Sequence, residues 1–236
     1  MSVYSIAEIN IKITTNNNYV TKKLKPYLST NSEYAFAVEA TKDDILYEKS
    51  IAEEYNADMC EFIAIFRKIC RKLLTDYNGI LMHSASILYK GKGYIFTAPS
   101  GTGKTTHIRL WKKYFGDKVE FINGDKPVLR NINSKIYVYG TPWQGKEDYG
   151  NNIKAPLAGI FLLQRGKENS VEKATAKESI SFLLAQTLRY QGQNEVEKLL
   201  AFIENIVVNI PVYKLKCNME MSAVETAVSV IEENNA

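Results

Sequence analysis

The chain has 236 residues, with 30 lysines and arginines against 26 aspartates and glutamates, so its formal net charge is +4. Apolar residues make up 45% of it and charged residues 24%, which is typical of a globular protein and excludes a disordered or fibrous chain. A charge this small, without a dense basic stripe, does not indicate nucleic-acid binding.

The numbers and spacing of the cysteines and histidines limit which disulfides and metal sites the chain could form. Cys60, Cys70 and Cys217 are an odd number of cysteines at no ligand-like spacing, and with only two histidines the chain has no zinc-site pattern. No run of about 18 apolar residues is present, and the N-terminus lacks the basic and apolar regions of a secretory signal. We therefore expect reduced thiols, a cytoplasmic location, and neither membrane nor nucleic acid as a partner.

Four elements are expected before residue 79. They are strands over Ser5–Thr14 and Tyr34–Val38, a short helix over Val20–Leu28, and a long helix whose apolar stripe runs from Met59 to Tyr77. Gly79 is expected to end the long helix. Residues 1–78 are therefore expected to extend a sheet and cover it with a helix, or to hold an acceptor.

The rest of the chain alternates strands and helices. Strands are expected over Ile80–Leu88, Gly93–Ala98, Val119–Ile122, Lys135–Tyr139, Ala158–Gln164 and Val212–Lys216. Helices are expected over Thr105–Phe115, Lys177–Tyr190 and Glu195–Val207, and from Met221 to Ile231. The first two strands are joined by a hairpin at residues 89–92. The pattern predicts one α/β domain over residues 1–236, with a catalytic core over 79–236.

The strongest motif is Ala-Pro-Ser-Gly-Thr-Gly-Lys-Thr at residues 98–105, which we call the phosphate loop. It matches the Gly-x-x-x-x-Gly-Lys-Ser/Thr pattern, with Ala98 in place of the first glycine. Gly101 and Gly103 permit backbone angles that turn successive N–H groups inward, toward an anion. The side chain of Lys104 is expected to reach the β- and γ-phosphates of a nucleotide, and the hydroxyl of Thr105 to bind Mg²⁺.

The context of the phosphate loop supports this interpretation. An apolar strand precedes it and a helix with a positive N-terminal dipole follows it, so a chance match is disfavoured. The expected nucleotide-binding residues are Pro99, Ser100, Gly101, Thr102, Gly103, Lys104, Thr105 and Thr106.

Asp125 is the second candidate, because it follows the apolar strand Val119–Ile122. If that strand lies parallel and adjacent to the strand before the phosphate loop, both end at the same edge of the sheet. A carboxylate there can bind Mg²⁺ or accept a proton from an attacking hydroxyl. The alternative is a structural aspartate in an Asn-Gly-Asp turn.

His83 is the third candidate. Folding the hairpin so that Leu88 pairs with Gly93 places His83 opposite Ala98, at the mouth of the phosphate loop. A histidine there can contact a phosphate or tune Asp125, but a one-residue slip reverses its face, and a structural histidine is the alternative. The other histidine, His107, is expected to be a surface or packing residue.

The neighbourhood of these residues resembles the catalytic core of HPr kinase/phosphorylase and the wider phosphoenolpyruvate carboxykinase-like kinase group. The similar segments are Leu81–Ile87, Gly93–Thr106 and Asn123–Asp125. Gly140–Lys146 and Ala155–Leu163 are similar to a subgroup of this family, whose relatives phosphorylate free serine or serine in peptides. The resemblance covers roughly Gly79 to Leu163.

The resemblance implies an α/β fold whose mixed central sheet carries the phosphate loop, with flanking helices, as in the C-terminal domain of HPr kinase and in phosphoenolpyruvate carboxykinase. It implies Lys104 and Thr105 for phosphates and metal, and His83 and Asp125 for phosphoryl transfer, with Asp125 as the base. It also implies ATP and Mg²⁺ as cofactors, and a homo-oligomer. Where the family has paired aspartates this chain has Gly124 and Asp125, and neither the HPr-binding signature nor the decarboxylating residues are found.

Four further residues are weaker candidates for the acceptor side. Trp143 and Lys146 lie in a polar loop that either closes over the acceptor or is a surface loop with one anchoring tryptophan. Lys154 and Arg165 flank the next strand, where either cation can offset charge on a transferring phosphoryl group.

The favoured hypothesis is a Mg²⁺- and ATP-dependent kinase acting on a hydroxyl of a peptide, a protein or a small molecule, with serine as the favoured residue. The alternative is a module that binds or hydrolyses ATP for regulation or assembly and has no phosphoryl acceptor. A GTPase is disfavoured because no Asn-Lys-x-Asp sequence is present.

Overall fold

The computed structural model describes residues 2–233, which divide into two compact units, one up to Tyr77 and one from Asn78 on. This differs from the single domain expected from the sequence. The three strands of the first unit pair with one another in a sheet of their own, so residues 1–78 are not the sheet extension that we expected. No helix among the described residues is long and apolar enough to cross a membrane.

The first unit is a small α/β arrangement with strand order β1-β2-β3. Its elements are β1 (Ser2–Ile6), β2 (Ile9–Thr14), α1 (Asn18–Leu24), a 3-10 turn (Lys25–Tyr27), β3 (Phe36–Glu39), α2 (Lys42–Ile51) and α3 (Ala57–Asp76). β2 runs antiparallel to β1 and parallel to β3. Buried residues of α3 recur at three- and four-residue steps, as the apolar stripe predicted.

Two expectations in this unit were wrong for local reasons. The strand expected over Ser5–Thr14 is a hairpin, because Ala7 and Glu8 form its turn with φ angles of 51° and 61°. Alanine and glutamate are not residues that signal a tight turn, so the break is invisible in the sequence. α3 ends before Gly79, and Asn78 takes the left-handed conformation with a φ of 48°.

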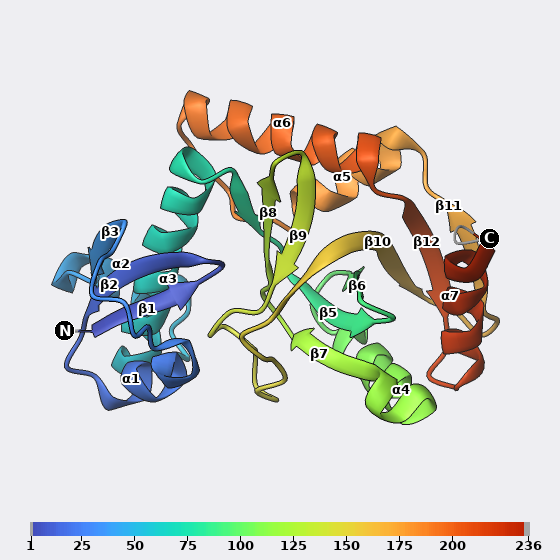
Figure 1. Cartoon of the computed structure of the whole chain (residues 1–236), viewed down its shortest axis with the longest axis horizontal. Helices are drawn as coiled ribbons and strands as arrows, with labels where there is room; N and C mark the ends of the chain where they lie inside the picture. The colour runs from blue at the N-terminus through green and yellow to red at the C-terminus, as the bar shows by residue number, and fades with distance from the viewer. Residues whose placement is uncertain (1, 234–236) are drawn as a thin grey trace. The chain divides into compact units, whose positions relative to one another are not determined.

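The second unit is built on a nine-stranded mixed sheet (Figure 1). Its strands are β4 (Gly79–Leu81), β5 (Ser84–Tyr89), β6 (Lys92–Thr97), β7 (Val119–Asn123), β8 (Val128–Ile132), β9 (Lys135–Tyr139), β10 (Lys154–Arg165), β11 (Ser170–Lys173) and β12 (Val212–Cys217). The order is β4-β8-β9-β10-β6-β5-β7, and β12 lies between β10 and β11. The predicted mixed α/β fold is confirmed, although β8 and β11 were not expected.

The strand expected over Ile80–Leu88 is two strands with different partners. β4 pairs with β8, whereas β5 pairs with β6 on one side and β7 on the other, all antiparallel. The change from pairing with β8 to pairing with β6 and β7 occurs at Met82 and His83, which lie between β4 and β5. This break places His83 immediately before β5.

β5 lies between β6 and β7, which is a correction to the adjacent parallel pair that we expected. Since β5 is antiparallel to both neighbours, β6 and β7 still run in the same direction and end at the same edge. The predicted hairpin register is confirmed, with Leu88 opposite Gly93 and Ser84 opposite Thr97. β5 therefore begins where β6 and β7 end.

The helices of this unit are α4 (Lys104–Phe115), α5 (Ala176–Ala185), α6 (Gln193–Asn209) and α7 (Ser222–Glu233), with a 3-10 turn at Gly116–Lys118. α4 packs on β5, β6 and β7 and also contacts α7, whereas α5 and α6 pack together (Figure 1). The core between α4 and the sheet is aromatic: Trp111 is fully buried beside Phe96, which stacks on Phe161 at 5.2 Å between ring centroids. This core fixes α4, and with it the phosphate loop, on the sheet.

Candidate active site

The phosphate loop connects β6 to α4, as predicted. Gly103 is the N-cap of α4 in the left-handed region, with a φ of 118°, and Gly101 has a φ of 76°. A side chain at either position would strain the backbone, which explains the two glycines. The loop is closed by the amide of Thr102, which donates to the carbonyl of Pro99 at 3.3 Å. The result is a turn that leads directly into a helix N-terminus, the arrangement that binds anions.

Lys104 reaches back over this loop. Its Nζ donates to the carbonyl of Ala98 at 2.9 Å and to that of Pro99 at 3.4 Å, and the residue is 8% exposed. Burial lowers the pKa of the Lys104 amine, Asp125 raises it, and the neighbouring Lys126 lowers it. The ammonium is therefore a desolvated cation held by neutral carbonyls, and an anion in the loop would be its natural partner.

Asp125 is held by a turn whose anchor is the buried Asn123. The Oδ1 of Asn123 accepts from the amides of Asp125 and Lys126, at 2.9 Å and 2.7 Å, and its amide group donates to the carbonyl and hydroxyl oxygens of Thr141, both at 3.1 Å. The Asn-Gly-Asp turn that we considered as the alternative is thus real. It aims the carboxylate of Asp125, so the turn and the candidate role are compatible.

His83 lies beside this carboxylate. Its Nε2 is 3.4 Å from Oδ1 of Asp125, and its carbonyl accepts from the hydroxyl of Thr97 at 2.9 Å. α5 ends earlier than expected, at Ala185, and the carbonyl of Gln186 then accepts from the amide of His83 at 2.7 Å. The predicted approach of His83 to the end of β6 and to Asp125 is thus present in the structure.

The electrostatic surroundings keep His83 uncharged near neutral pH. Burial and the nearby Lys104 lower the pKa of the imidazole below 6.5, Asp125 raises it, Lys126 lowers it, and a hydrogen bond with Gln186 raises it. A neutral imidazole can donate to the carboxylate without removing its charge.

Lys126 is the functional candidate that the sequence analysis missed. Its Nζ forms an ion pair with Oδ2 of Asp125, while its carbonyl accepts from the hydroxyl of Thr141 at 2.7 Å. The backbone is therefore fixed from both sides, but the side chain remains 36% exposed. The sequence feature that could have revealed Lys126 is its position directly after Asp125, at the end of a predicted strand.

The segment of residues 140–153, between β9 and β10, lies against this carboxylate. A Cβ added at Gly145 would be 3.0 Å from the Cβ of Asp125. A Cβ at Gly124 would be 3.1 Å from the Cβ of Tyr149, so a side chain there would displace the segment. Trp143 is buried and anchors the segment, whereas Lys146 is exposed.

The two other cations lie at opposite ends of β10. Lys154 begins the strand, with its ammonium 5.2 Å from the centroid of the Tyr137 ring. Arg165 ends it and donates to the carbonyls of Gly101 and Thr102 in the phosphate loop. A strand of 12 residues spans roughly 40 Å, so the two cations cannot act on one phosphoryl group. Their roles stay predictions.

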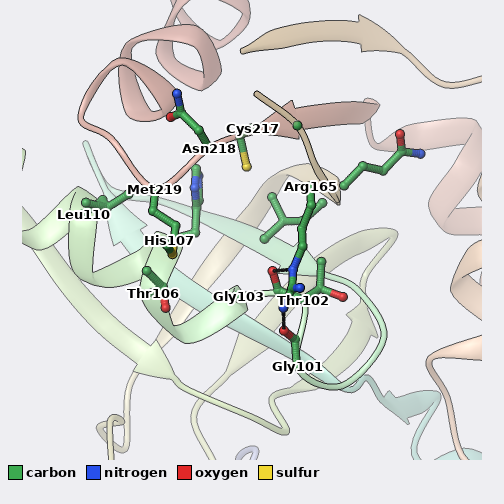
Figure 2. Close-up of a pocket in the computed structure, with 13 residues that line it drawn as sticks. Gly101, Thr102, Gly103, Thr106, His107, Leu110, Arg165, Cys217, Asn218 and Met219 are labelled. Carbon is green, nitrogen blue, oxygen red and sulfur yellow. Dashed lines mark hydrogen bonds between the residues drawn. The ribbon is translucent and has the colours of Figure 1, made fainter. Parts of the chain in front are cut away.

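A cavity of about 470 Å³ adjoins the phosphate loop on the side of β10 and β12 (Figure 2). It is bounded by the loop, by the first turns of α4, and by the residues at and just after the ends of the two strands. Along this edge the strands follow one another as β12, β10, β6, β5 and β7. The cavity and the Asp125–His83 pair therefore lie on opposite sides of the phosphate loop.

The residues expected to hold Mg²⁺ fit that ion chemically. Thr105 is the second residue of α4 and is partly exposed, and its hydroxyl and the Asp125 carboxylate are the hard oxygen donors that Mg²⁺ prefers. No group of three His, Cys, Asp or Glu residues that could hold a metal occurs within residues 2–233. Phosphate oxygens and water would supply the other ligands, as is usual for Mg²⁺ at nucleotide sites.

Comparison with known proteins leaves the family unassigned. No model of a known protein family matches the sequence, and no curated protein matches it. Among solved structures, the HPr(Ser) kinase/phosphatase from Coxiella burnetii is similar over 66% of this chain and 94% of its own, with a TM-score of 0.38 and 9% identity.

The chain's two histidines allow a direct test of the site's electrostatics by NMR titration. We expect His83 to titrate below pH 6.5, and His107 to stay neutral down to about pH 4 because burial lowers its pKa to about 3. Lys104→Ala should raise the pKa of His83, because it removes a nearby cation, and Asp125→Asn should lower it. Lys118→Ala, at an exposed lysine, is the control and should change neither. A His83 midpoint above 6.5, or unchanged in both variants, would contradict this geometry.

Proposed function

We propose that this protein is a Mg²⁺- and ATP-dependent kinase that transfers the γ-phosphoryl group to a hydroxyl, with serine of a peptide or protein, or a small molecule, as the acceptor. The observation that carries the proposal is the placement of the Asp125–His83 pair beside the mouth of the phosphate loop, where β5 begins and β6 ends. A loop that only bound nucleotide would not need a carboxylate with an imidazole on one oxygen and an ammonium on the other.

The phosphate loop and Lys104 supply the binding half of the reaction. The backbone N–H groups of residues 101–104 and the helix dipole bind the β-phosphate, and the ammonium of Lys104 turns from the carbonyl of Ala98 to the β- and γ-phosphate oxygens. Mg²⁺ held at Thr105, and at Asp125 through a water molecule, would neutralise charge on the same phosphate oxygens. Positioning and charge neutralisation are the main requirements of phosphoryl transfer.

Asp125 supplies the acceptor half. The acceptor oxygen attacks the γ-phosphorus, the bond from that phosphorus to the β–γ bridging oxygen breaks, and the hydroxyl proton passes to the Asp125 carboxylate. His83, whose Nε2 lies 3.4 Å from Oδ1 of Asp125 and whose side chain is hydrogen-bonded to Gln186, keeps the carboxylate oriented. Opening of the segment that carries Gly145 would admit the acceptor, because this segment lies against Asp125 in the free protein.

Lys126 completes the acceptor side as a second cation. In the free protein it neutralises Asp125, and with nucleotide bound its ammonium can move to the γ-phosphoryl oxygens, which leaves Asp125 free to accept the proton. The fixed backbone and partly exposed side chain of Lys126 suit such a change of partner.

The experiment that tests the proposal uses γ-labelled ATP, Mg²⁺ and a fractionated lysate of the host. We expect label on one peptide or metabolite with the natural protein, and none with Lys104→Ala, because the phosphates are no longer held. Asp125→Asn should reduce transfer by at least 100-fold while nucleotide affinity, measured by calorimetry, changes by less than about threefold. Label released only as phosphate would favour the ATP-hydrolysing module, and an equal loss of transfer and affinity in Asp125→Asn would make Asp125 a metal-binding or structural residue.

Lys126→Met tests the second cation. It preserves much of the side chain's length and apolar stem but removes the charge, so we expect the transfer rate at saturating ATP to fall roughly 100-fold, as for other removed transition-state donors. The affinity for ATP should change little, since Lys104 and the loop amides remain. Lys118→Met, at an exposed lysine just before β7, is the matched control. An unchanged rate with Lys126→Met would exclude this role for Lys126.

A further inference from the structure

The cavity beside the phosphate loop contains a buried imidazole that phosphoryl transfer does not use. His107 lies one turn into α4, is 3% exposed and lines the cavity. It was expected to be a surface or packing residue, and the structure shows that it is not at the surface. The indole Nε1 of Trp111 donates to its Nε2 at 3.1 Å. Because an indole N–H can only donate, Nε2 is the acceptor and the hydrogen of the neutral imidazole is on Nδ1.

This Nδ1–H is buried and has no hydrogen-bond partner among residues 2–233. Buried donors without a partner are rare, because each forfeits the hydrogen bond that it made with water. The imidazole is also uncharged, since burial lowers its pKa to about 3. Its ring packs on Phe96, at 4.6 Å between centroids, and Trp111 holds it from the other nitrogen, so the ring is fixed in place beside the cavity that the residue lines.

The cavity has the size and lining of a small-molecule site. Its volume of about 470 Å³ is within the range of roughly 300–1,000 Å³ that is usual for such sites. Leu110, Leu163 and Met219 give it apolar walls, and Figure 2 shows His107 directed from α4 toward the end of β12, where Cys217 and Asn218 lie. Apolar walls with a few fixed polar groups suit a flat heterocycle and its sugar.

The position of the cavity relative to the phosphate loop indicates which part of a nucleotide would occupy it. The phosphate loop is shared: Gly101, Thr102 and Gly103 border the cavity, and Arg165 holds the carbonyls of the first two. A nucleotide whose γ-phosphate points to Asp125 must leave the loop in the other direction along the sheet edge. That direction leads past Thr106 into the cavity, under the ends of β10 and β12.

We propose that this cavity binds the nucleoside portion of the nucleotide and that Nδ1–H of His107 donates a hydrogen bond to it. The inference rests on nucleotide binding in the proposed function, but it does not depend on phosphoryl transfer. Purine rings and ribose oxygens both offer acceptors to a neutral donor. His107 is thus a binding residue for the nucleoside, and Trp111 is the positioning residue that fixes its tautomer.

Two substitutions separate the roles of the two ring nitrogens. His107→Gln places an amide oxygen near the former Nε2, which keeps an acceptor for Trp111 and removes the donor in the cavity. His107→Asn places an amide group near the former Nδ1, which keeps a donor in the cavity and removes the acceptor for Trp111. The two variants are matched in chemistry, and thermal unfolding of each checks that it is folded.

The measurement is calorimetric affinity for ATP and for inorganic tripolyphosphate, each with Mg²⁺. The tripolyphosphate occupies the phosphate loop but has no nucleoside. The natural protein should bind ATP more tightly than tripolyphosphate. His107→Gln should weaken ATP binding by about three- to tenfold, the size of one neutral hydrogen bond, and leave tripolyphosphate binding unchanged. His107→Asn should keep more of the ATP affinity than His107→Gln and lower the unfolding temperature.

Three results would overturn the inference. They are equal affinity of the natural protein for the two ligands, an equal loss of both affinities in His107→Gln, and no effect of His107→Gln on ATP. The first of these needs no variant, so it decides the matter even if a substitution prevents folding. A protein that shows the expected affinities but transfers no label would keep this inference and refute the kinase.

Discussion

The site depends on one feature of the sheet, the insertion of the antiparallel strand β5 between the two strands β6 and β7, which run in the same direction. Because β5 begins where its neighbours end, three chain segments meet at one edge: the phosphate loop after β6, His83 before β5 and Asp125 after β7. The hairpin register that pairs Leu88 with Gly93 determines that these three segments lie close together. A slip of one residue would turn His83 to the other face of the sheet.

Charge at this edge is arranged for an anion. Two ammonium groups, Lys104 and Lys126, share a single carboxylate, Asp125, and the one imidazole beside them is uncharged near neutral pH. Lys104 is also held by carbonyl groups, which do not neutralise it. The free site therefore carries an excess of positive charge in a partly desolvated place, where interactions with phosphate oxygens are stronger than in water. The nucleoside cavity on the other side of the loop has apolar walls at Leu110, Leu163 and Met219 and a single cation, Arg165, at its border with the loop.

Much of the site could be predicted because its determinants are local. The phosphate loop is a contiguous motif, and the approach of His83 to Asp125 follows from a hairpin register that a short turn at Lys90 and Gly91 sets. Lys126 was missed because its role depends on Asn123 and Thr141, which are 18 residues apart in the sequence and meet only in the fold. The same is true of His107, whose free nitrogen becomes evident only when Trp111 is seen to occupy the other one.

The errors in the fold prediction have related causes. The turn at Ala7 and Glu8 uses residues that do not mark a turn, and the division between β4 and β5 reflects a change of partner strand that no local pattern encodes.

We infer that the nucleotide lies along one edge of the sheet, from the His107 cavity to Asp125. A crystal structure with Mg²⁺ and a non-hydrolysable ATP analogue tests it most directly. We expect the nucleoside beside His107, the β-phosphate in the loop and the γ-phosphate toward Asp125 and Lys126. A nucleotide bound in the reverse direction, or away from the loop, would contradict this arrangement.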